Sequence, residues 1–430
     1  MSELNVWQST ELRDLVEIDP EVLRENTDRD YHFHYVDIAS VSEGRVDMPS
    51  FTIPFRGSPS RARKVVRRGD VLMSTVRPNL KAFAYFDYPY DDCVASTGFA
   101  VLRAKQNVDP RFVLYSILSE PVTRQIESLI VGSNYPAINS TAVSQLKVLT
   151  PTATEQTKIA DVLATVDQAI EQTEALIAKQ QRIKTGLMQD LLTKGIDEHG
   201  NLRSETTHEF KDSPLGRIPV EWNVIQLSKI ADVSSGLTLG KTHSGPNTVE
   251  LPYLRVANVQ DGYLDLSDVT MIRVPNSYVA KYQLLVGDVL MNEGGDFDKL
   301  GRGTVWRGEI DSCLHQNHVF KVRPNSEKLE SEYLAAISAS PYGKAFFMLA
   351  SKQSTNLASI NSTQLKSFPI PLPPLPEQKA LVELVRAQSE TLESSQQERR
   401  KLASLKTALM QDLLTGKKRV SPLLKPASTD

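Results

Sequence analysis

The stretch Leu187-Met188-Gln189-Asp190-Leu191-Leu192-Thr193 returns unchanged as Leu409-Met410-Gln411-Asp412-Leu413-Leu414-Thr415. It belongs to a longer repeat, in which residues 134–193 correspond without a gap to residues 356–415, at a constant separation of 222 positions. A repeat of this length is too long for one unit of a solenoid. It predicts a duplicated module, made of a domain and the tail that follows it, and therefore a pseudo-symmetric molecule with two similar ends.

A weaker repeat lies upstream, at a separation of 218 positions. There Gly69-Asp70-Val71-Leu72-Met73 corresponds to Gly287-Asp288-Val289-Leu290-Met291, and the two cysteines, Cys93 and Cys313, which are 220 positions apart, also fall in equivalent places. Because each cysteine belongs to a different copy, we expect no disulfide between them. The duplication therefore covers the domains as well as their tails.

The composition is that of a globular chain with two or three domains. Of the 430 residues 40% are hydrophobic, which is enough to form buried cores, and the formal net charge is −3. A protein that coats DNA regardless of sequence is usually basic, whereas a protein that reads a sequence can confine its positive charge to one groove. Two cysteines in a chain of this length are typical of a reducing compartment. No secretion signal follows Met1, and no apolar stretch reaches the roughly 18 residues of a membrane span, so we expect a soluble cytoplasmic protein that binds no membrane.

Each copy begins with a segment that mixes short strands with helices. Phe99–Leu102 and its counterpart Val319–Val322 have the composition of strands, whereas residues 110–130 and 329–350 have helical patterns. These elements do not alternate regularly, as they would in a doubly wound parallel sheet. The sequence therefore predicts an α+β fold for both domains.

A long helical rod is predicted after each domain. Residues 152–193 contain no proline, and Thr152 with Glu155 three residues later has the spacing of a capping box. Hydrophobic residues recur at spacings of three and four, which places them on one face of a helix. About 40 helical residues at 1.5 Å each give a rod of roughly 60 Å, too long for an ordinary globular helix. The stripe positions are Ile159, Leu163, Val166, Ile170, Leu187 and Leu191 in the first rod, and Leu381, Val385, Leu392, Leu409 and Leu413 in the second.

Two arrangements of the rods fit this pattern. Each stripe could pack on its own domain, or the two rods could pack against each other as an antiparallel coiled coil. Equal length, equal pattern and a similar domain before each rod favour the antiparallel pair, which would hold the two domains apart in opposite orientations. The predicted segments are residues 1–150 for the first domain, 151–196 for the first rod, 197–217 for a polar linker, 218–372 for the second domain, 373–416 for the second rod, and 417–430 for a basic, frayed tail.

The sequence carries no established catalytic motif. It lacks the Asp/Asn-Pro-Pro-Tyr/Phe tetrapeptide of amino-methyltransferases. The run Gly236–Thr242 is one residue short of a P-loop, and Asp296-Phe297-Asp298-Lys299 places a carboxylate directly beside a lysine, where the two would not face one metal ion. We therefore expect no catalytic residue and no bound nucleotide in this chain.

A polar cluster, His315-Gln316-Asn317-His318, follows Cys313. A zinc site would need four ligands at a recognisable spacing, and the first copy has Ala95-Ser96-Thr97-Gly98 at the equivalent place. We expect structural hydrogen bonds or contact with a nucleic-acid base at this cluster, and no metal site.

The remaining candidates indicate recognition of nucleic acid. Six cations between Arg56 and Arg68 have no acid among them, and neutralising phosphates needs such clustering, although a solvated charged face is the alternative. Within the polar run Gly294–Gly303 a cation could reach a guanine edge, and the Asn and Gln residues just before each rod suit adenine edges or form turns. The candidate DNA-binding residues are Arg56, Arg61, Arg63, Lys64, Arg77, Lys81, Ser133, Asn134, Tyr135, Lys241, Lys299, Arg302, Gln353, Ser354 and Asn356.

The doubled order of the motifs carries a family resemblance. Gly-Asp-Val-Leu-Met lies in each domain, Ile-Asn-Ser-Thr precedes each rod (from Ile138 and Ile360), Pro-x-x-x-Glu-Gln opens each rod, and Leu-Met-Gln-Asp-Leu-Leu-Thr closes it. Ile218-Pro219-x-x-Trp222 at the start of the second domain fits as well, whereas the first domain lacks this opening. Over residues 5–416 the chain resembles the specificity subunit of a Type I restriction–modification enzyme.

This resemblance implies a non-catalytic subunit with two target-recognition domains, each reading half of a bipartite, asymmetric target in double-stranded DNA. It implies that the two helices set the gap between the halves and dock two methyltransferase subunits that methylate adenine. Restriction and translocase subunits would complete the full complex. S-adenosylmethionine, ATP and Mg²⁺ would then be bound by these partners and not by this chain. Two alternatives remain: a fused modification enzyme, which would need a methyltransferase motif, and a coiled-coil scaffold, which would leave the divergent loops unexplained.

Overall fold

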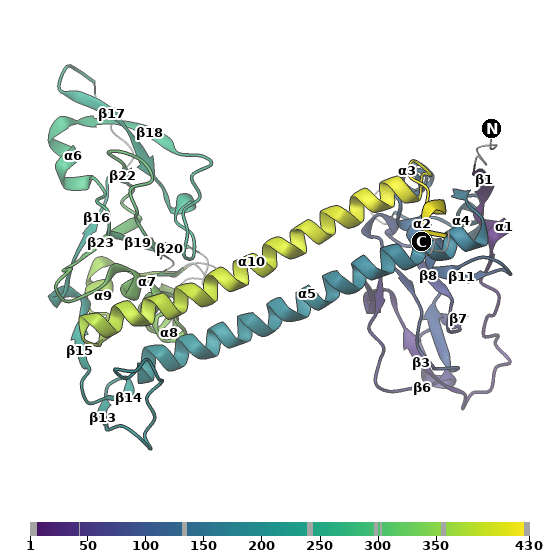
Figure 1. Cartoon of the computed structure of the whole chain (residues 1–430), viewed down its shortest axis with the longest axis horizontal. Coiled ribbons are helices and arrows are strands. Elements are labelled where there is room, and N and C mark those ends of the chain that lie inside the picture. Colours follow the sequence, from purple (N-terminus) through teal and green to yellow (C-terminus); the bar gives the residue numbers. More distant parts are fainter. Residues whose placement is uncertain are drawn as a thin grey trace, which may run out of the picture. The chain divides into compact units, whose positions relative to one another are not determined.

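The computed structural model describes residues 7–42, 44–130, 136–238, 244–295, 300–301, 303–353 and 358–424. The chain forms two compact units: the first joins Met1–Ala175 to Gln396–Asp430, and the second is Leu176–Ser395. Each unit contains one of the duplicated domains with part of both long helices, α5 (Ala153–Lys194) and α10 (Leu375–Leu413) (Figure 1). Among the described residues no helix has the length and apolar character to cross a membrane.

Two four-stranded sheets form the first domain. One has the order β2-β11-β8-β9 and is antiparallel throughout, and the other has the order β6-β3-β10-β7, in which β3 and β10 run parallel. One core cluster lies between the first sheet and the helices α2 and α3, and a second lies between the two sheets. The element bounds are β1 (Gln8–Glu11), α1 (Leu12–Leu15), β2 (Val16–Ile18), β3 (His32–Val36), β4 (Val41–Ser42), β5 (Arg45–Val46), β6 (Ile53–Pro54), β7 (Ala62–Val66), β8 (Val71–Ser74), β9 (Phe83–Tyr85), β10 (Cys93–Ser96), β11 (Phe99–Ala104), α2 (Pro110–Leu118), α3 (Glu120–Leu129), α4 (Ser140–Ser144) and β12 (Lys147–Thr150).

The second domain repeats this pairing. Its main sheet has the order β16-β23-β19-β21 and is antiparallel, and its other sheet has the order β18-β17-β22, in which β17 and β22 run parallel. The α+β fold predicted for both copies is therefore confirmed. The element bounds are β13 (Phe210–Ser213), β14 (Gly216–Pro219), β15 (Asn223–Gln226), β16 (Ala231–Ser235), β17 (Thr248–Leu254), β18 (Thr270–Pro275), α6 (Asn276–Tyr282), β19 (Val289–Asn292), β20 (Gly294–Gly295), β21 (Gly303–Val305), β22 (Leu314–His315), β23 (Val319–Pro324), α7 (Ser331–Ala339), α8 (Pro341–Ala350), β24 (Lys352–Gln353), β25 (Ala358–Ser359), α9 (Ser362–Lys366) and β26 (Pro369–Leu372).

The repeated Gly-Asp pair has a structural role in both domains. Asp70 and Asp288 are each 1% exposed. Arg103 donates two hydrogen bonds of 2.9 Å to Asp70, and Arg323 donates two of 2.6 and 2.8 Å to Asp288. These bidentate bonds tie the start of β8 to β11 and the start of β19 to β23, so the motif fixes the central strand pair of each main sheet.

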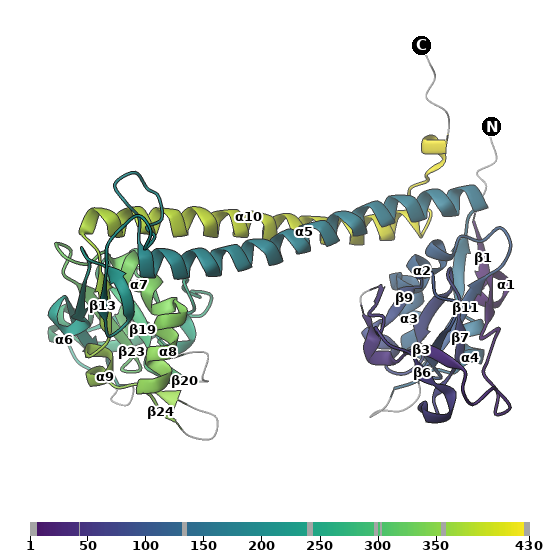
Figure 2. The same cartoon turned by 90° about the horizontal axis from the view of Figure 1, so that it is seen from below.

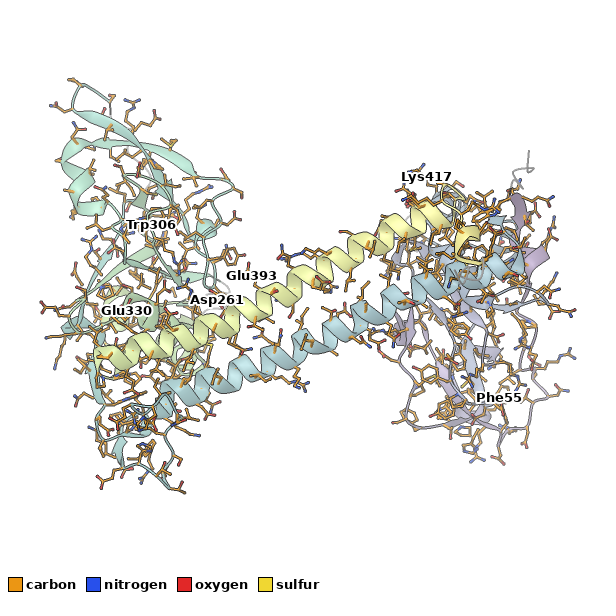
Figure 3. The ribbon with its side chains drawn as sticks, viewed as in Figure 1. Phe55, Asp261, Trp306, Glu330, Glu393 and Lys417 are labelled. Atoms are coloured by element: carbon orange, nitrogen blue, oxygen red, sulfur yellow. The ribbon has the colours of Figure 1, made fainter. Side chains whose placement is uncertain are left out.

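The repeated glutamine at the start of each long helix joins that helix to its own domain. Gln156 Oε1 accepts a hydrogen bond of 3.1 Å from the backbone N–H of Asp109, just before α2. Gln378 Oε1 accepts one of 2.9 Å from the backbone N–H of Glu330, just before α7, and Figure 3 shows Glu330 beside the start of α10. Both amides also donate to the proline carbonyl that precedes their helix. The Glu-Gln motif thus orients each domain on its helix.

The two long helices pack antiparallel within each unit (Figures 1 and 2). In the first unit Asp167 pairs with Lys406 at 2.5 Å and Glu174 with Arg399 at 2.9 Å, so seven residues forward along α5 correspond to seven backward along α10. In the second unit Leu191 near the end of α5 shares a core cluster with Leu381 near the start of α10. The predicted antiparallel pair is therefore confirmed.

The hydrophobic stripes serve both arrangements that the sequence allowed. Ile159 and Leu163 are fully buried among Phe112 and Tyr115 of their own domain and Leu413 of the other helix. Leu191, Leu381, Leu392 and Leu413 are also buried, and Leu187, Val385 and Leu409 are partly buried against these cores. Val166 and Ile170 are half-buried.

Part of the C-terminal tail is anchored to the start of α5. Arg419 donates hydrogen bonds of 3.0 and 2.8 Å to Glu155, Ser421 donates another of 3.0 Å, and Val420 between them is 1% exposed. Lys417, labelled in Figure 3, pairs with Asp412 at 3.4 Å. The expectation of a frayed tail is therefore wrong for residues 417–421.

Candidate nucleic-acid interface

Three loops meet at one edge of the first domain. The hairpin loop between β8 and β9 begins at Thr75, whose N–H donates to the carbonyl of Gly98 in the β10–β11 turn at 2.8 Å. The same loop joins the segment that precedes α4, because Ile138 N–H donates to the Thr75 carbonyl at 2.9 Å and Arg77 N–H to the Pro136 carbonyl at 2.7 Å. We call residues 75–82, 97–98 and 136–138 the first loop face.

The second domain builds the same face from equivalent residues. Glu293 N–H donates to the carbonyl of His318 in the β22–β23 turn at 2.9 Å, and Ile360 N–H donates to the Glu293 carbonyl at 2.8 Å. β20 in the hairpin loop pairs with β25, which directly precedes Ile360. We call residues 293–295, 300–301, 316–318 and 358–360 the second loop face; residues 296–299 and 302 lie outside the described residues.

Several candidates from the sequence fall on or next to these faces. Arg77 and Lys81 flank the turn of the first hairpin loop in left-handed conformations, with φ of +48° and +52°, and between them Leu80 is 68% exposed. Such strain in non-glycine residues is common at functional sites. Lys81 Nζ donates to the Leu118 carbonyl at 3.3 Å, which ties this loop to the end of α2.

The side chains of the other loop candidates are not described; of these residues Gln353 has a described backbone, in β24, where it pairs with Ala358. In the sequence Lys299 and Arg302 fall between β19 and β21, which pair as β8 and β9 do on either side of Arg77 and Lys81. The candidates whose side chains are not described are Ser133, Asn134, Tyr135, Lys241, Lys299, Arg302, Gln353, Ser354 and Asn356.

The cation cluster of the first domain is largely neutralised by acids that are distant in the sequence. Arg56 pairs with Asp30 at 2.5 Å, Arg67 with Glu21 at 2.9 Å and Arg68 with Asp87 at 2.7 Å. The guanidinium of Arg67, followed by that of Arg103, lowers the pKa of the Glu21 carboxyl to about 2. These pairs reduce the positive potential that the sequence alone suggested.

Lys64 is a core residue and not a surface cation. Its residue is 9% exposed, its ammonium lies 2.7 Å from Asp19 Oδ2, and it also donates to the Phe99 carbonyl. Because a buried, paired ammonium cannot reach a DNA phosphate, the expectation for Lys64 is corrected.

Arg61 and Arg63 remain on the surface of the first domain. The Arg63 guanidinium lies 5.0 Å from the centroid of the Phe55 ring, which Figure 3 labels, as a cation–π contact. Arg61 is exposed, and its backbone carbonyl accepts a hydrogen bond of 2.8 Å from Thr97 N–H on the first loop face. Of the predicted cluster, Arg61 is the cation that adjoins this face.

The polar cluster after Cys313 divides into a core residue and surface residues. His315 is fully buried, its Nδ1 lies 2.7 Å from the Val319 carbonyl, and burial lowers its pKa to about 4. Asn317 and His318 lie on the second loop face, where they are at least partly exposed. Among the described residues no group of three or more potential ligands is placed to hold a metal ion.

Both cysteines are free, buried thiols. Burial raises the pKa of Cys93 and of Cys313 to about 12, so neither is a reactive thiolate at neutral pH. Cys93 lies in a core cluster of the first domain and Cys313 in one of the second domain.

A cleft of about 1080 Å³ lies in the second unit between α7 and α10. Ala335, Ala336 and Ala339 line one wall and Val382 and Val385 the other. Lysine, arginine and glutamate side chains are mixed around it, without the paired groups of an acid–base site.

Comparison with known proteins agrees with this duplicated architecture. The family model described as the Type I restriction modification DNA specificity domain matches the chain twice, at residues 5–180 and 219–404. The putative type I restriction enzyme MjaX specificity subunit of Methanocaldococcus jannaschii is 31% identical over 178 residues, which are 41% of this chain and 41% of that protein. The MjaVIII specificity subunit of the same organism is 28% identical over 341 residues, 77% of this chain and 75% of that protein.

The fold is also similar to a solved structure. A chain from a study of complex assembly and conformational transition in the type I R-M system aligns with a TM-score of 0.60 and 24% identity, over 96% of this chain and 99% of that chain. At this identity the likeness concerns the fold alone. The two family matches together span well over half of the sequence, and the chain therefore belongs to the family of Type I restriction modification DNA specificity proteins.

Proposed function

We propose that this chain is the sequence-specific DNA-recognition subunit of a Type I restriction–modification system. Each domain reads one half of a bipartite, asymmetric target through its loop face. The observation that carries this proposal is that equivalent strands and backbone hydrogen bonds hold unlike residues on the two faces, with Thr75, Thr97 and Gly98 on one and Glu293, Asn317 and His318 on the other. Two similar frames with different reading residues suit two different half-targets.

The antiparallel helices fit the role of a spacer and a docking surface. Their ion pairs and shared leucines fix one register within each unit, which would set the unread gap between the half-targets. Leu176, Ile183 and Leu405 on these helices are between 46 and 48% exposed. Apolar side chains left at the surface of a helix pair suit docking of partner helices, and we assign them to two methyltransferase subunits.

The chemistry in this proposal belongs to partner subunits. Methyltransferase subunits would bind S-adenosylmethionine and methylate adenine, and restriction and translocase subunits would use ATP and Mg²⁺. This chain supplies the choice of sequence, and it acts as a non-catalytic subunit. Its recognition would direct either methylation or cleavage of the same target.

The test is a map of adenine methylation across the host genome, with and without this chain. We expect the loss of one split, asymmetric motif when the chain is deleted, and its return when the chain is restored. An unchanged map in cells that express the methyltransferase subunits would contradict the proposal and favour the coiled-coil scaffold.

A second test concerns the spacer. Four residues inserted into either long helix should change the length of the gap in the methylated motif and leave both half-targets unchanged. A changed half-target would contradict the role of the helices as a ruler.

A further inference from the structure

Three side chains of the second loop face form a hydrogen-bonded chain. His318 Nδ1 lies 2.5 Å from Glu293 Oε2, and Asn317 Nδ2 lies 3.3 Å from His318 Nε2. Glu293 comes from the hairpin loop after β19, whereas Asn317 and His318 come from the β22–β23 turn. These hydrogen bonds therefore link two of the three loops that make this face. Its middle member is well exposed, with 56% of the His318 side chain accessible to solvent.

The chemistry of each group fixes the next one. A carboxylate only accepts hydrogen bonds, so His318 Nδ1 is the donor to Glu293, and in the neutral ring Nε2 is then an acceptor. This acceptor takes one N–H of the Asn317 amide. The amide is therefore oriented with its nitrogen toward His318, and it keeps one N–H and the Oδ1 oxygen for another partner.

Asn317 has unused hydrogen-bonding capacity. Its only side-chain hydrogen bond to another described residue is the one to His318, so none of them donates to Oδ1. Its neighbour Gln316 differs, since Gln316 Oε1 accepts a bond of 3.3 Å from the backbone N–H of Val256. An amide that offers one donor and one acceptor side by side matches the N7 acceptor and N6 donor of adenine in the major groove.

The fold itself does not require these side chains. In the first domain the equivalent turn has Thr97 and Gly98, and Thr75 stands in the place of Glu293. The backbone bond between the two loops is nevertheless the same, at 2.8 Å in the first domain and 2.9 Å in the second. There the Thr75 hydroxyl donates to the Gly98 carbonyl at 2.9 Å, within the loop contact. Glu293, Asn317 and His318 are thus an addition of the second domain to a turn that closes without them.

We propose that Asn317 reads an adenine in the second half-target, and that His318 and Glu293 are positioning residues that hold its amide in the reading orientation. This inference rests on the proposed function and deepens it, because it assigns one base position to one side chain. The first domain has Thr75, Thr97 and Gly98 in place of these three residues. Its half-target is therefore read differently.

The experiment uses the full chain assembled with its methyltransferase partners. Binding is measured to DNA duplexes that carry the target motif identified by the methylation map, and to variant duplexes in which each base pair of both half-targets is replaced in turn. For Asn317→Ala we expect the preference for adenine at one position of the second half-target to fall by about tenfold or more, which is the usual share of one bidentate contact. Preferences at the other positions and affinity for unrelated DNA should stay unchanged.

Further variants separate reading from positioning. His318→Ala and Glu293→Ala should weaken the preference at the same base position, by less than Asn317→Ala, and Glu293→Gln should restore part of it, since its amide oxygen can still accept from His318. Thr97→Ala at the equivalent turn of the first domain is the matched control and should leave the second half-target unaffected. Thermal unfolding of each variant shows whether the fold is intact.

The outcomes distinguish this inference from the proposed function. Wild-type complex with no sequence preference would overturn the proposed function, and the inference with it. The inference alone would be overturned if the wild-type complex has a clear target but the folded Asn317→Ala variant keeps all its base preferences. It would also be overturned if that variant loses its base preferences equally at all positions.

Discussion

Each domain attaches its long helix through an equivalent glutamate at the start of that helix, but the two glutamates have different partners. Glu377 at the start of α10 pairs with Arg203 and accepts hydrogen bonds from the Trp222 indole at 3.2 Å and from the Ile196 backbone N–H at 3.0 Å. All of these come from the segments that follow α5 and open the second domain. Its equivalent Glu155 is instead held by Arg419 and Ser421 of the C-terminal tail.

A tryptophan takes part at both attachments. Trp222 is fully buried and donates to Glu377, whereas the Trp7 ring lies 5.1 Å from the Arg419 guanidinium and its indole nitrogen has no partner among the described residues. The first domain thus lacks the Pro-x-x-Trp opening in sequence but supplies a tryptophan from its N-terminal segment. The same arrangement of groups in space therefore occurs at both attachments, but the arginine and the tryptophan are more deeply buried at the second one, whereas the two glutamate side chains are buried to a similar extent, 5% exposed for Glu155 and 8% for Glu377.

Removing the carboxylate at each attachment tests this difference most strongly. Glu377→Ala leaves the Arg203 guanidinium, whose side chain is 9% exposed, without its partner. We expect a loss of about 3–5 kcal/mol in the free energy of unfolding of the second unit. Glu155→Ala should cost the first unit about 1–2 kcal/mol, because Arg419 is 30% exposed and stays hydrated. Denaturant unfolding followed by tryptophan fluorescence measures both, and equal losses would contradict the comparison.

The buried lysine of the first domain gives the next largest effect. Lys64→Met should lower the free energy of unfolding by about 2–3 kcal/mol, because Asp19, with a side chain 17% exposed, loses its ionic partner and keeps only the hydrogen bonds from the Val101 N–H and the Ser140 hydroxyl. Since Lys64 is inside the domain, the salt dependence of DNA binding should stay unchanged. Arg61→Ala is the matched surface variant and should instead reduce that salt dependence by about one ionic contact. A changed salt dependence for a folded Lys64→Met variant would show that our placement of Lys64 is wrong.

The glycines that follow the two long helices sharpen the comparison further. Gly195 and Gly416 both have a positive φ, +64° and +71°, so alanine is strained by a similar amount at each. At Gly195 an added Cβ would also lie 2.2 Å from Glu377 Oε1 and 2.5 Å from the Trp222 ring, whereas at Gly416 the nearest atom, in the Trp7 ring, is 3.2 Å away. We expect Gly416→Ala to cost about 1 kcal/mol and Gly195→Ala about 2 kcal/mol. Thermal unfolding checks the order, and a larger effect at Gly416 would contradict it.

The sequence predicted the frame of this molecule better than its surface. The rods, their antiparallel pairing and the α+β domains follow from local periodicity and from a repeat, both of which can be read along the chain. The acids that neutralise Arg56, Arg67 and Arg68 could not be found in this way, because Asp30, Glu21 and Asp87 reach them only through the folded sheets.

The candidate site was predicted in part for the same reason. The resemblance between Gly69–Met73 and Gly287–Met291 could have shown that the loop after Met73 and the loop after Met291 are equivalent. That these loops meet the β10–β11 and β22–β23 turns depends on strand pairing across more than twenty residues, which no local pattern encodes. Burial of Lys64 was missed because a lysine on a strand is usually a surface residue.

The smallest expected effect is on stability at acid pH. It tests a difference between the ion pairs on the main sheets of the two domains. In the first domain Glu21 bridges Arg67 and Arg103, whereas in the second domain Arg323 forms an ion pair with Asp288 alone among the described residues. Arg67, followed by Arg103, lowers the pKa of Glu21 from 4.5 to about 2. Because the folded-state pKa is lowered, the stabilisation by Glu21 is complete above the unfolded value of 4.5 and is lost as the pH falls through about 2.

Glu21→Gln therefore separates this bridge from the rest of the acid response. At about pH 6 the free energy of unfolding of this variant should be lower than that of the wild type, by less than about 1 kcal/mol. The difference is small because the Glu21 side chain is 38% exposed and its ion pairs are screened by solvent. The difference should shrink between pH 4.5 and about 2, as the wild-type carboxyl is protonated. Unfolding of the first unit, followed by the fluorescence of Trp7 in a chain whose other tryptophans are replaced by phenylalanine, measures this. A difference that does not change with pH would mean that Glu21 acts through packing, and the two main sheets would then differ in shape and not in charge.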